Sequence, residues 1–154
     1  CALPIWVDAR AGNWSEGLTA YLADHLIQEA QGGGAEYRRK LLERYTSFAA
    51  DGRDLALRDF RSRHSDATQA VGYGKALMLF HMLRRQIGDA AFVAGLQTLW
   101  QRHRFSAAGF DEVAAALQST ASGDALDPRW RDTPGAPQLV IAGQIGRAPC
   151  RERV

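Results

Sequence analysis

Ala76-Leu77-Met78-Leu79-Phe80-His81-Met82-Leu83 lies in the most apolar segment of the chain, which runs from about residue 68 to residue 87. Its large apolar side chains would cover nearly all sides of a helix, and such a helix is usually buried in a larger body. Gly88 fits the C-cap position at which this helix would end. The segment therefore predicts one buried helix within a mainly helical protein.

The flanking segments repeat the helical spacing of apolar residues. One helix is expected from about residue 13 to the glycines at 32–34, and a second from about residue 35 to residue 50. Beyond Gly88, Asp89 fits the N-cap of a fourth helix and Ser106 the start of a fifth. The residues that define these stripes are Leu18, Leu22, Leu26, Tyr37, Leu41, Tyr45, Phe48, Phe92, Val93, Leu96, Leu99, Trp100, Phe110, Val113, Ala114 and Leu117.

The other segments are predicted to be irregular. Residues 53–66 are highly charged, with three apolar anchors: Leu55, Leu57 and Phe60. From residue 119 the chain contains glycines and prolines that are typical of a loop. A short apolar run at 138–142 then predicts the start of a strand. The predicted fold class is mainly α, with a helical part over residues 6–120. An exit loop and the start of a following β segment are expected over residues 121–144.

Neither end of the chain resembles natural protein. Residues 1–5, Cys1-Ala2-Leu3-Pro4-Ile5, resemble a translated sequencing adapter, and residues 145–154 resemble the reverse adapter. Segments of this kind are excluded from reasoning about the fold. We therefore expect residues 6–144 to be the genuine part of a longer gene. The alternative is that residues 145–154 are a natural basic tail.

The charge of the chain gives no bulk argument for nucleic-acid binding. The 154 residues include 19 Lys and Arg against 17 Asp and Glu, a formal net charge of +2. Residues 145–154 contain three arginines and one glutamate, so the rest of the chain is neutral. Both cysteines, Cys1 and Cys150, lie in the suspect ends, which leaves no cysteine for a disulfide or a zinc site between them. No apolar run approaches the roughly 18 residues that a membrane span needs.

Glu16 and Tyr73 both have ordinary structural interpretations. Asn13 followed three residues later by Glu16 is typical of a capping box, and a carboxylate in the first turn suits the helix dipole. Tyr73 fits an aromatic side chain packed where the buried helix begins, and the glycines Gly72 and Gly74 beside it would allow close approach of another group. From the residues alone, these structural interpretations are favoured.

Two motifs nevertheless resemble the M1 family of zinc aminopeptidases, the gluzincins. Trp14-Ser15-Glu16-Gly17 resembles the Trp-x-Glu-Gly stretch that supplies the family's third zinc ligand. Tyr73-Gly74-Lys75-Ala76 resembles the Tyr-x-Lys-Gly/Ala stretch, with Ala76 in place of the usual glycine. Similar continuations follow at residues 88–92 and 130–137. The resemblance extends over almost the whole chain, from about Val7 to Ala142.

The resemblance implies a thermolysin-like helical subdomain and a zinc-dependent activity. In that family the matching glutamate, Glu16 here, completes a site of two histidines and one glutamate, and zinc activates a water molecule. The matching tyrosine, Tyr73 here, donates a hydrogen bond to the oxyanion. The His-Glu-x-x-His motif that supplies the other ligands and the general base is absent. The family spacing of eighteen intervening residues places it just before Cys1, so we expect a truncated catalytic domain.

The remaining polar residues are expected to be structural. Lys75 fits a salt bridge or a helix contact, and the basic run at 38–40 fits a solvated helix face. The four histidines show no metal-binding spacing, so His25 and His81 are expected to be packed core or rim residues.

The resemblance leads to a prediction for the parent protein: a Zn²⁺ aminopeptidase that cleaves the N-terminal peptide bond of peptides. Glu16 is the predicted metal ligand and Tyr73 the predicted catalytic residue. No nucleic-acid partner is expected, and these 154 residues alone are expected to be inactive. The alternatives are a related gluzincin hydrolase with another specificity, and a degenerate relative kept as a scaffold or binding module.

Overall fold

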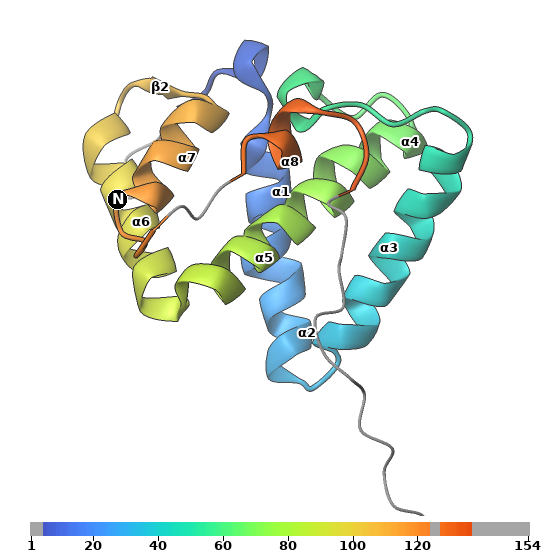
Figure 1. Ribbon diagram of the computed structural model, residues 1–154, viewed down its shortest axis with the longest axis horizontal. Helices are drawn as coiled ribbons and strands as arrows, with labels where there is room; N and C mark the ends of the chain where they lie inside the picture. The colour runs from blue at the N-terminus through green and yellow to red at the C-terminus, as the bar shows by residue number, and fades with distance from the viewer. Residues whose placement is uncertain (1–4, 124–126, 137–154) are drawn as a thin grey trace, which may run out of the picture.

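The computed structural model describes residues 5–123 and 127–136. Helices make up most of these residues, so the prediction of a mainly α fold is confirmed. Figure 1 shows a central α5 that crosses α1, with α3 on one side and α6 and α7 on the other. None of the described helices is long and apolar enough to cross a membrane.

Two composite helices form the centre of the fold. The first runs through α1 (Trp14–Ala20), a π-helical turn (Tyr21–His25) and α2 (Leu26–Ala30). It is called here the Glu16 helix. The second runs through α4 (Asp66–Gln69), a π-helical segment (Ala70–Lys75) and α5 (Ala76–Ile87), and is called the Tyr73 helix. Each composite helix therefore contains one segment of π-helix, which the sequence did not predict.

Three further helices pack around this pair. The second predicted helix is α3 (Gly34–Ala50), and the fourth is α6 (Asp89–His103). Gly88 ends α5 with a positive φ of 86°, as predicted for a C-cap, and it is also the N-cap of α6 in place of Asp89. The fifth helix, α7 (Phe110–Gln118), begins after Gly109 and not at Ser106.

The segment around Ser106 is extended because it pairs with the start of the chain. Residues Ala107–Ala108 form β2, which lies parallel to β1 (Trp6–Val7). The amide of Trp6 also donates to the carbonyl of Ser106 at 3.1 Å. This two-stranded contact joins residues about a hundred positions apart, which local patterns cannot predict.

Short elements complete the described part of the fold. Two 3₁₀ turns, Ala9–Ala11 and Leu57–Asp59, lie in the loops, and α8 (Arg129–Asp132) follows the gap at 124–126. Buried Arg131 of α8 forms ion pairs with Asp111 (2.7 Å) and Asp132 (2.6 Å). The pair with Asp111 attaches α8 to the start of α7.

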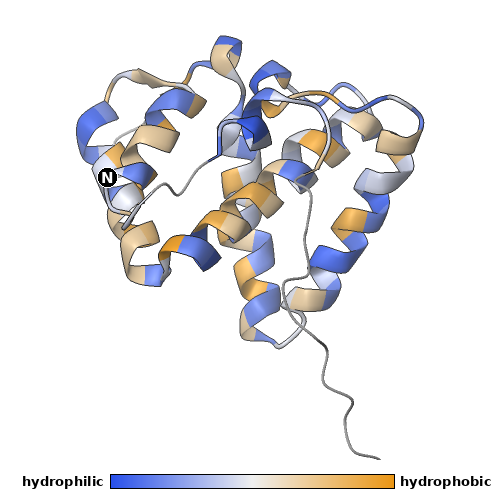
Figure 2. Cartoon of the chain, in the orientation of Figure 1, coloured by the Kyte–Doolittle hydropathy of each residue, from blue (hydrophilic) through white to orange (hydrophobic). Residues whose placement is uncertain are grey.

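The core lies where the two composite helices meet α6 and α7. Figure 2 shows hydrophobic residues concentrated along α5, and long hydrophilic stretches on α3. The predicted anchors Leu57 and Phe60 are buried, with 1% and 2% of their surface exposed. Val93 and Trp100 are exceptions to the predicted stripe of α6, because 52% and 39% of their surfaces are exposed.

Several predictions fall on residues outside the described ranges. These are the adapter-like character of residues 1–4 and 145–154 and the strand at 138–142. The proposed boundary near residue 120 also stays a prediction, because the structure describes only part of the segment that follows it.

Candidate functional site

Trp14 fixes the position of the helical turn that carries Glu16. Its indole is buried, and Nε1 donates to the backbone carbonyl of Ala108 in β2 at 2.7 Å. The helix starts next to Asn13, as predicted, but Asn13 makes no cap hydrogen bond. Its amide instead donates to the carbonyl of Arg61 (3.0 Å), and its oxygen accepts from Ser15 (2.8 Å).

The capping-box interpretation of Glu16 is therefore wrong. A capping box needs the Asn13 side chain to bind the backbone of the first turn, and that contact is absent. Since the Glu16 carboxylate is not used to cap the helix, it is available for contacts with a neighbouring element.

Glycines allow the two composite helices to approach closely. A Cβ atom added at Gly17 would lie 2.3 Å from Cβ of Ala76, so the backbones cross here almost in contact. At Gly72, an added Cβ would lie 2.1 Å from the ring of Phe60. The close approach expected beside Tyr73 is thus made by Phe60, whose ring lies edge-on to Tyr73 with centroids 6.5 Å apart.

This close packing brings Glu16 and Tyr73 together. Tyr73 lies inside the π-helical segment of its helix, and not where the buried helix begins as the sequence indicated. The Glu16 carboxylate raises the pKa of the Tyr73 phenol, first by hydrogen bonding and also by its charge, and partial burial acts in the same direction. Tyr73 therefore keeps its proton at neutral pH and can act as a hydrogen-bond donor.

Tyr73 also borders a pocket of about 150 Å³. Its polar lining comes from three helices: Asp24 from the π-helical turn, Arg44 from α3 and Gln69 from α4. Pockets that combine an apolar wall with a few polar groups are typical binding sites. The pair of Glu16 and Tyr73 is thus accompanied by a concave surface on the Tyr73 side.

Lys75 has the structural role that the sequence predicted. Its ammonium is buried and lies 3.5 Å from the carboxylate of Asp54, and it donates to the carbonyls of Leu55 (3.1 Å) and Thr133 (3.2 Å). Burial lowers the pKa of Lys75, and Asp54 opposes this shift. The Tyr73 helix is therefore attached to the loop after α3 and to the segment after α8.

His25 lies in the core and His81 at its rim, as expected, and the two rings also contact each other. His25 and His81 lie together with Glu29, and one possible donor atom from each lies within 4.8 Å of the others. The sequence spacing could not reveal this group, since His81 is on the other composite helix. His25 and Glu29, four residues apart on one helix, were the available signal.

Comparison with known proteins finds a partial similarity to an aminopeptidase. No family model and no solved structure matches the chain. Over 78 residues, 49% of its length, the chain is 33% identical to aminopeptidase N of Lactococcus lactis subsp. lactis. It spans 9% of the length of that protein. About half of the chain is therefore similar to a small part of an aminopeptidase.

Glu16 fits zinc only as a single ligand. Catalytic zinc sites use three protein ligands and keep a fourth position for water. Among the described residues, the one group of three His, Cys, Asp or Glu side chains close enough to hold a metal does not include Glu16. The described residues therefore do not build a zinc site around Glu16, and any further ligands there must come from other residues.

Proposed function

We propose that this chain is part of a zinc-dependent aminopeptidase of the M1 type, within the helical subdomain of its gluzincin catalytic domain. The observation that carries the proposal is that Glu16 and Tyr73, from two separate motifs on adjacent helices, lie close enough for Glu16 to raise the pKa of Tyr73. The similarity to aminopeptidase N supports the same class of enzyme.

In this proposal Glu16 is the third metal ligand and Tyr73 is the catalytic hydrogen-bond donor. Two histidines and a general base come from a His-Glu-x-x-His motif that these 154 residues do not contain. The zinc ion, when bound, supplies Lewis acidity and an activated water. The Tyr73 phenol, which stays protonated beside Glu16, donates to the substrate oxygen as negative charge develops on it.

The packing around the pair supports these roles. The contact of Gly17 with Ala76 sets the distance between the two helices, and the buried Phe60 supports Tyr73 from behind. A donor is most effective when its position is fixed before the reaction begins. The pocket beside Tyr73 would then receive a part of the peptide substrate.

The proposal is tested in the longer protein that contains this segment. Glu16→Gln should remove one bound zinc ion per chain, because it removes a charged ligand. Tyr73→Phe should retain zinc but lower kcat for an aminoacyl anilide by about 10²- to 10³-fold, the usual effect of losing one oxyanion donor. Elemental analysis and steady-state kinetics measure the two effects separately.

Glu43→Gln is the matched control, since Glu43 is an exposed glutamate of α3 that pairs with Arg39. It should change neither zinc content nor kcat. Full zinc content in the Glu16 variant would reject the ligand role. An inactive longer protein would instead support the scaffold alternative, and activity on another bond would support a related gluzincin hydrolase.

A further inference from the structure

A second cluster of titratable side chains lies further along the same two helices. His25 ends the π-helical turn of the Glu16 helix, Glu29 lies one turn later in α2, and His81 lies in α5. The Nδ1 atom of His25 is 3.5 Å from the carboxylate of Glu29. The rings of His25 and His81 lie edge to face, with their centroids 5.1 Å apart.

Both imidazoles in this cluster have a buried nitrogen without a hydrogen-bond partner. His25 is completely buried, and the Nδ1 atoms of His25 and His81 make no hydrogen bond. Buried polar atoms in folded proteins almost always have partners, so two orphaned nitrogens in one cluster need an explanation. A metal ion would supply the missing interaction at His81, and at His25 once Arg38 is displaced.

Burial and charge both act on the two imidazoles. Burial lowers the pKa of His25 and lowers that of His81 to about 4, with the nearby Arg38 adding to both shifts. Glu29, whose side chain is 41% exposed, supplies an oxygen ligand from the rim.

We propose that His25, Glu29 and His81 form a binding site for a divalent transition metal of the zinc type, separate from Glu16. Two imidazole nitrogens and one carboxylate oxygen are a donor set that zinc uses, with the fourth position open to water. Ligands at tetrahedral angles around zinc lie about 3.3 Å apart. The present spacing of up to 4.8 Å closes to that value when the donor atoms move together by about 1.5 Å.

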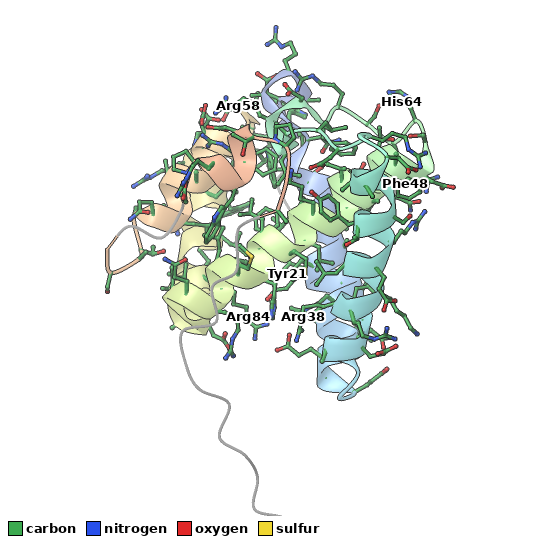
Figure 3. The ribbon with its side chains drawn as sticks, turned by 45° about the vertical axis from the view of Figure 1, so that its right-hand side comes forward. Tyr21, Arg38, Phe48, Arg58, His64 and Arg84 are labelled. Atoms are coloured by element: carbon green, nitrogen blue, oxygen red, sulfur yellow. The ribbon has the colours of Figure 1, made fainter. Side chains whose placement is uncertain are left out.

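A cleft gives the metal a route to the cluster. Glu29, His81, Arg38 and Arg85 line an open cavity of about 330 Å³ at this end of the molecule. Figure 3 shows Arg38 and Arg84 at this end, below Tyr21. The ring of Tyr21 stacks on His25 with centroids 4.9 Å apart, so the inner side of the site is closed by an aromatic wall.

Arg38 competes with the metal for His25. Its guanidinium lies 2.7 Å from Nε2 of His25. A guanidinium can only donate, so this contact requires a lone pair on Nε2 and a proton on Nδ1. A metal on Nδ1 requires the opposite tautomer, and a metal on Nε2 would take the place of Arg38. Metal binding therefore displaces the Arg38 side chain toward the cleft.

The cations around the cluster set the strength of the site. Arg38, Arg84 and Arg85 face it from α3 and α5, although Arg84 is paired with Glu29 (3.3 Å) and Asp89 (2.8 Å). The positive charge of these arginines would also favour the binding of a small anion in the same cleft. The experiment distinguishes a bound metal ion from a bound anion.

The test measures Zn²⁺ binding to the 154-residue chain by isothermal titration calorimetry and equilibrium dialysis. Cys1→Ser and Cys150→Ser are introduced first, because thiolates bind zinc. We expect one Zn²⁺ per chain and at least a tenfold loss of affinity in His81→Gln. His64→Gln, at an exposed histidine, is the matched control and should leave the affinity unchanged.

Arg38→Gln is a second variant, and it is expected to strengthen binding. A gain in affinity cannot result from a chain that fails to fold. A glutamine carbonyl can accept a hydrogen bond from Nε2–H of a metal-bound His25, so this variant should bind Zn²⁺ about tenfold more tightly. Co²⁺ should give the visible absorption of a four-coordinate complex in the same variant.

Two results would overturn the proposal. One is that the unsubstituted chain and the Arg38→Gln chain bind Zn²⁺ no more tightly than the His81→Gln chain does. The other is binding of inorganic phosphate, but not Zn²⁺, in a manner that depends on Arg38. Glu16→Gln should leave the affinity of this site unchanged, so failure of the proposed aminopeptidase function and failure of this site are distinguishable.

Discussion

The Glu16 helix and the Tyr73 helix meet in two polar regions that differ in how they are built. In the first region, Glu16 and Tyr73 lie half-buried at the surface, and each belongs to a contiguous motif. In the second, His25, Glu29 and His81 gather around a completely buried imidazole and belong to no motif. Both regions take residues from π-helical segments, which often mark functional sites.

The difference shows what a motif contributes to prediction. Glu16 and Tyr73 could be paired from the sequence because the family resemblance connects two distant motifs. His25 and His81 could not be paired, since their contact depends on where the π-helical turn directs His25. The predictions that follow disturb one region or the other, from the largest expected effect to the smallest.

Phe60→Ala should destabilise the first region most. The ring of Phe60 is buried against Gly72 and edge-on to Tyr73, so truncation leaves a cavity beneath the site. We expect the free energy of unfolding to fall by about 3–5 kcal/mol, as measured by urea denaturation.

Phe105→Ala is the control for Phe60→Ala, because Phe105 is 55% exposed. It should change the free energy of unfolding by less than about 0.5 kcal/mol. Equal effects of the two substitutions would contradict the position assigned to Phe60.

Gly17→Ala should separate the two helices at their crossing. The new methyl group would collide with Ala76, and overpacking of this kind costs about 1–3 kcal/mol. Ala76→Gly alone should cost about 1 kcal/mol through helix propensity.

The double variant Gly17→Ala, Ala76→Gly restores the space at the crossing and should be more stable than Gly17→Ala alone. Urea denaturation of all four proteins gives the coupling energy. Simple additivity would show that the two residues are not in contact.

Arg84→Gln should weaken the second region by about 1 kcal/mol. The guanidinium donates to the buried Tyr21 hydroxyl (3.2 Å) and pairs with Glu29 and Asp89, so the variant loses a network that only partly faces solvent. Thermal denaturation measures the effect. Arg129→Gln is the control, since the Arg129 side chain is 82% exposed, and a decrease in stability as large as for Arg84→Gln would contradict the account.

Glu16→Gln should lower the pKa of Tyr73, the smallest of the four effects. Because the folded state raises this pKa above 10, the contact stabilises the fold below pH 10, and the contribution is lost as pH rises through the folded value. Ultraviolet titration of tyrosinate, with Tyr73→Phe to identify the signal, measures the shift. An unchanged titration in Glu16→Gln would show that the two side chains do not interact.

The sequence predicted the helices well because their apolar stripes are local. The buried segment around Leu77 and Phe80, the α3 helix and the Gly88 cap all lie where the spacing of residues placed them. It did not predict the strand pairing of Trp6 with Ala107 or the ion pair of buried Arg131 with Asp111. Those contacts join distant segments and follow from tertiary packing alone.

Glu16 and Tyr73 are site residues that the sequence predicted, but their surroundings were not predicted. Ala76 and Phe60 occupy the space beside Gly17 and Gly72, so a larger side chain would collide at either position. Neither neighbour is apparent from the local spacing of residues in the sequence. Asn13 and Glu16 resembled a capping box, and the structure instead uses Asn13 to bind the carbonyl of Arg61.

The proposed function is tested most directly by the coding sequence upstream of Val7 in the source DNA. The account predicts a His-Glu-x-x-His motif whose second histidine lies nineteen positions before Glu16, where it would meet Glu16 and Tyr73 in one metal site. Other residues at those positions would contradict the aminopeptidase proposal, and the contact between Glu16 and Tyr73 would then belong to a helical scaffold without catalytic zinc.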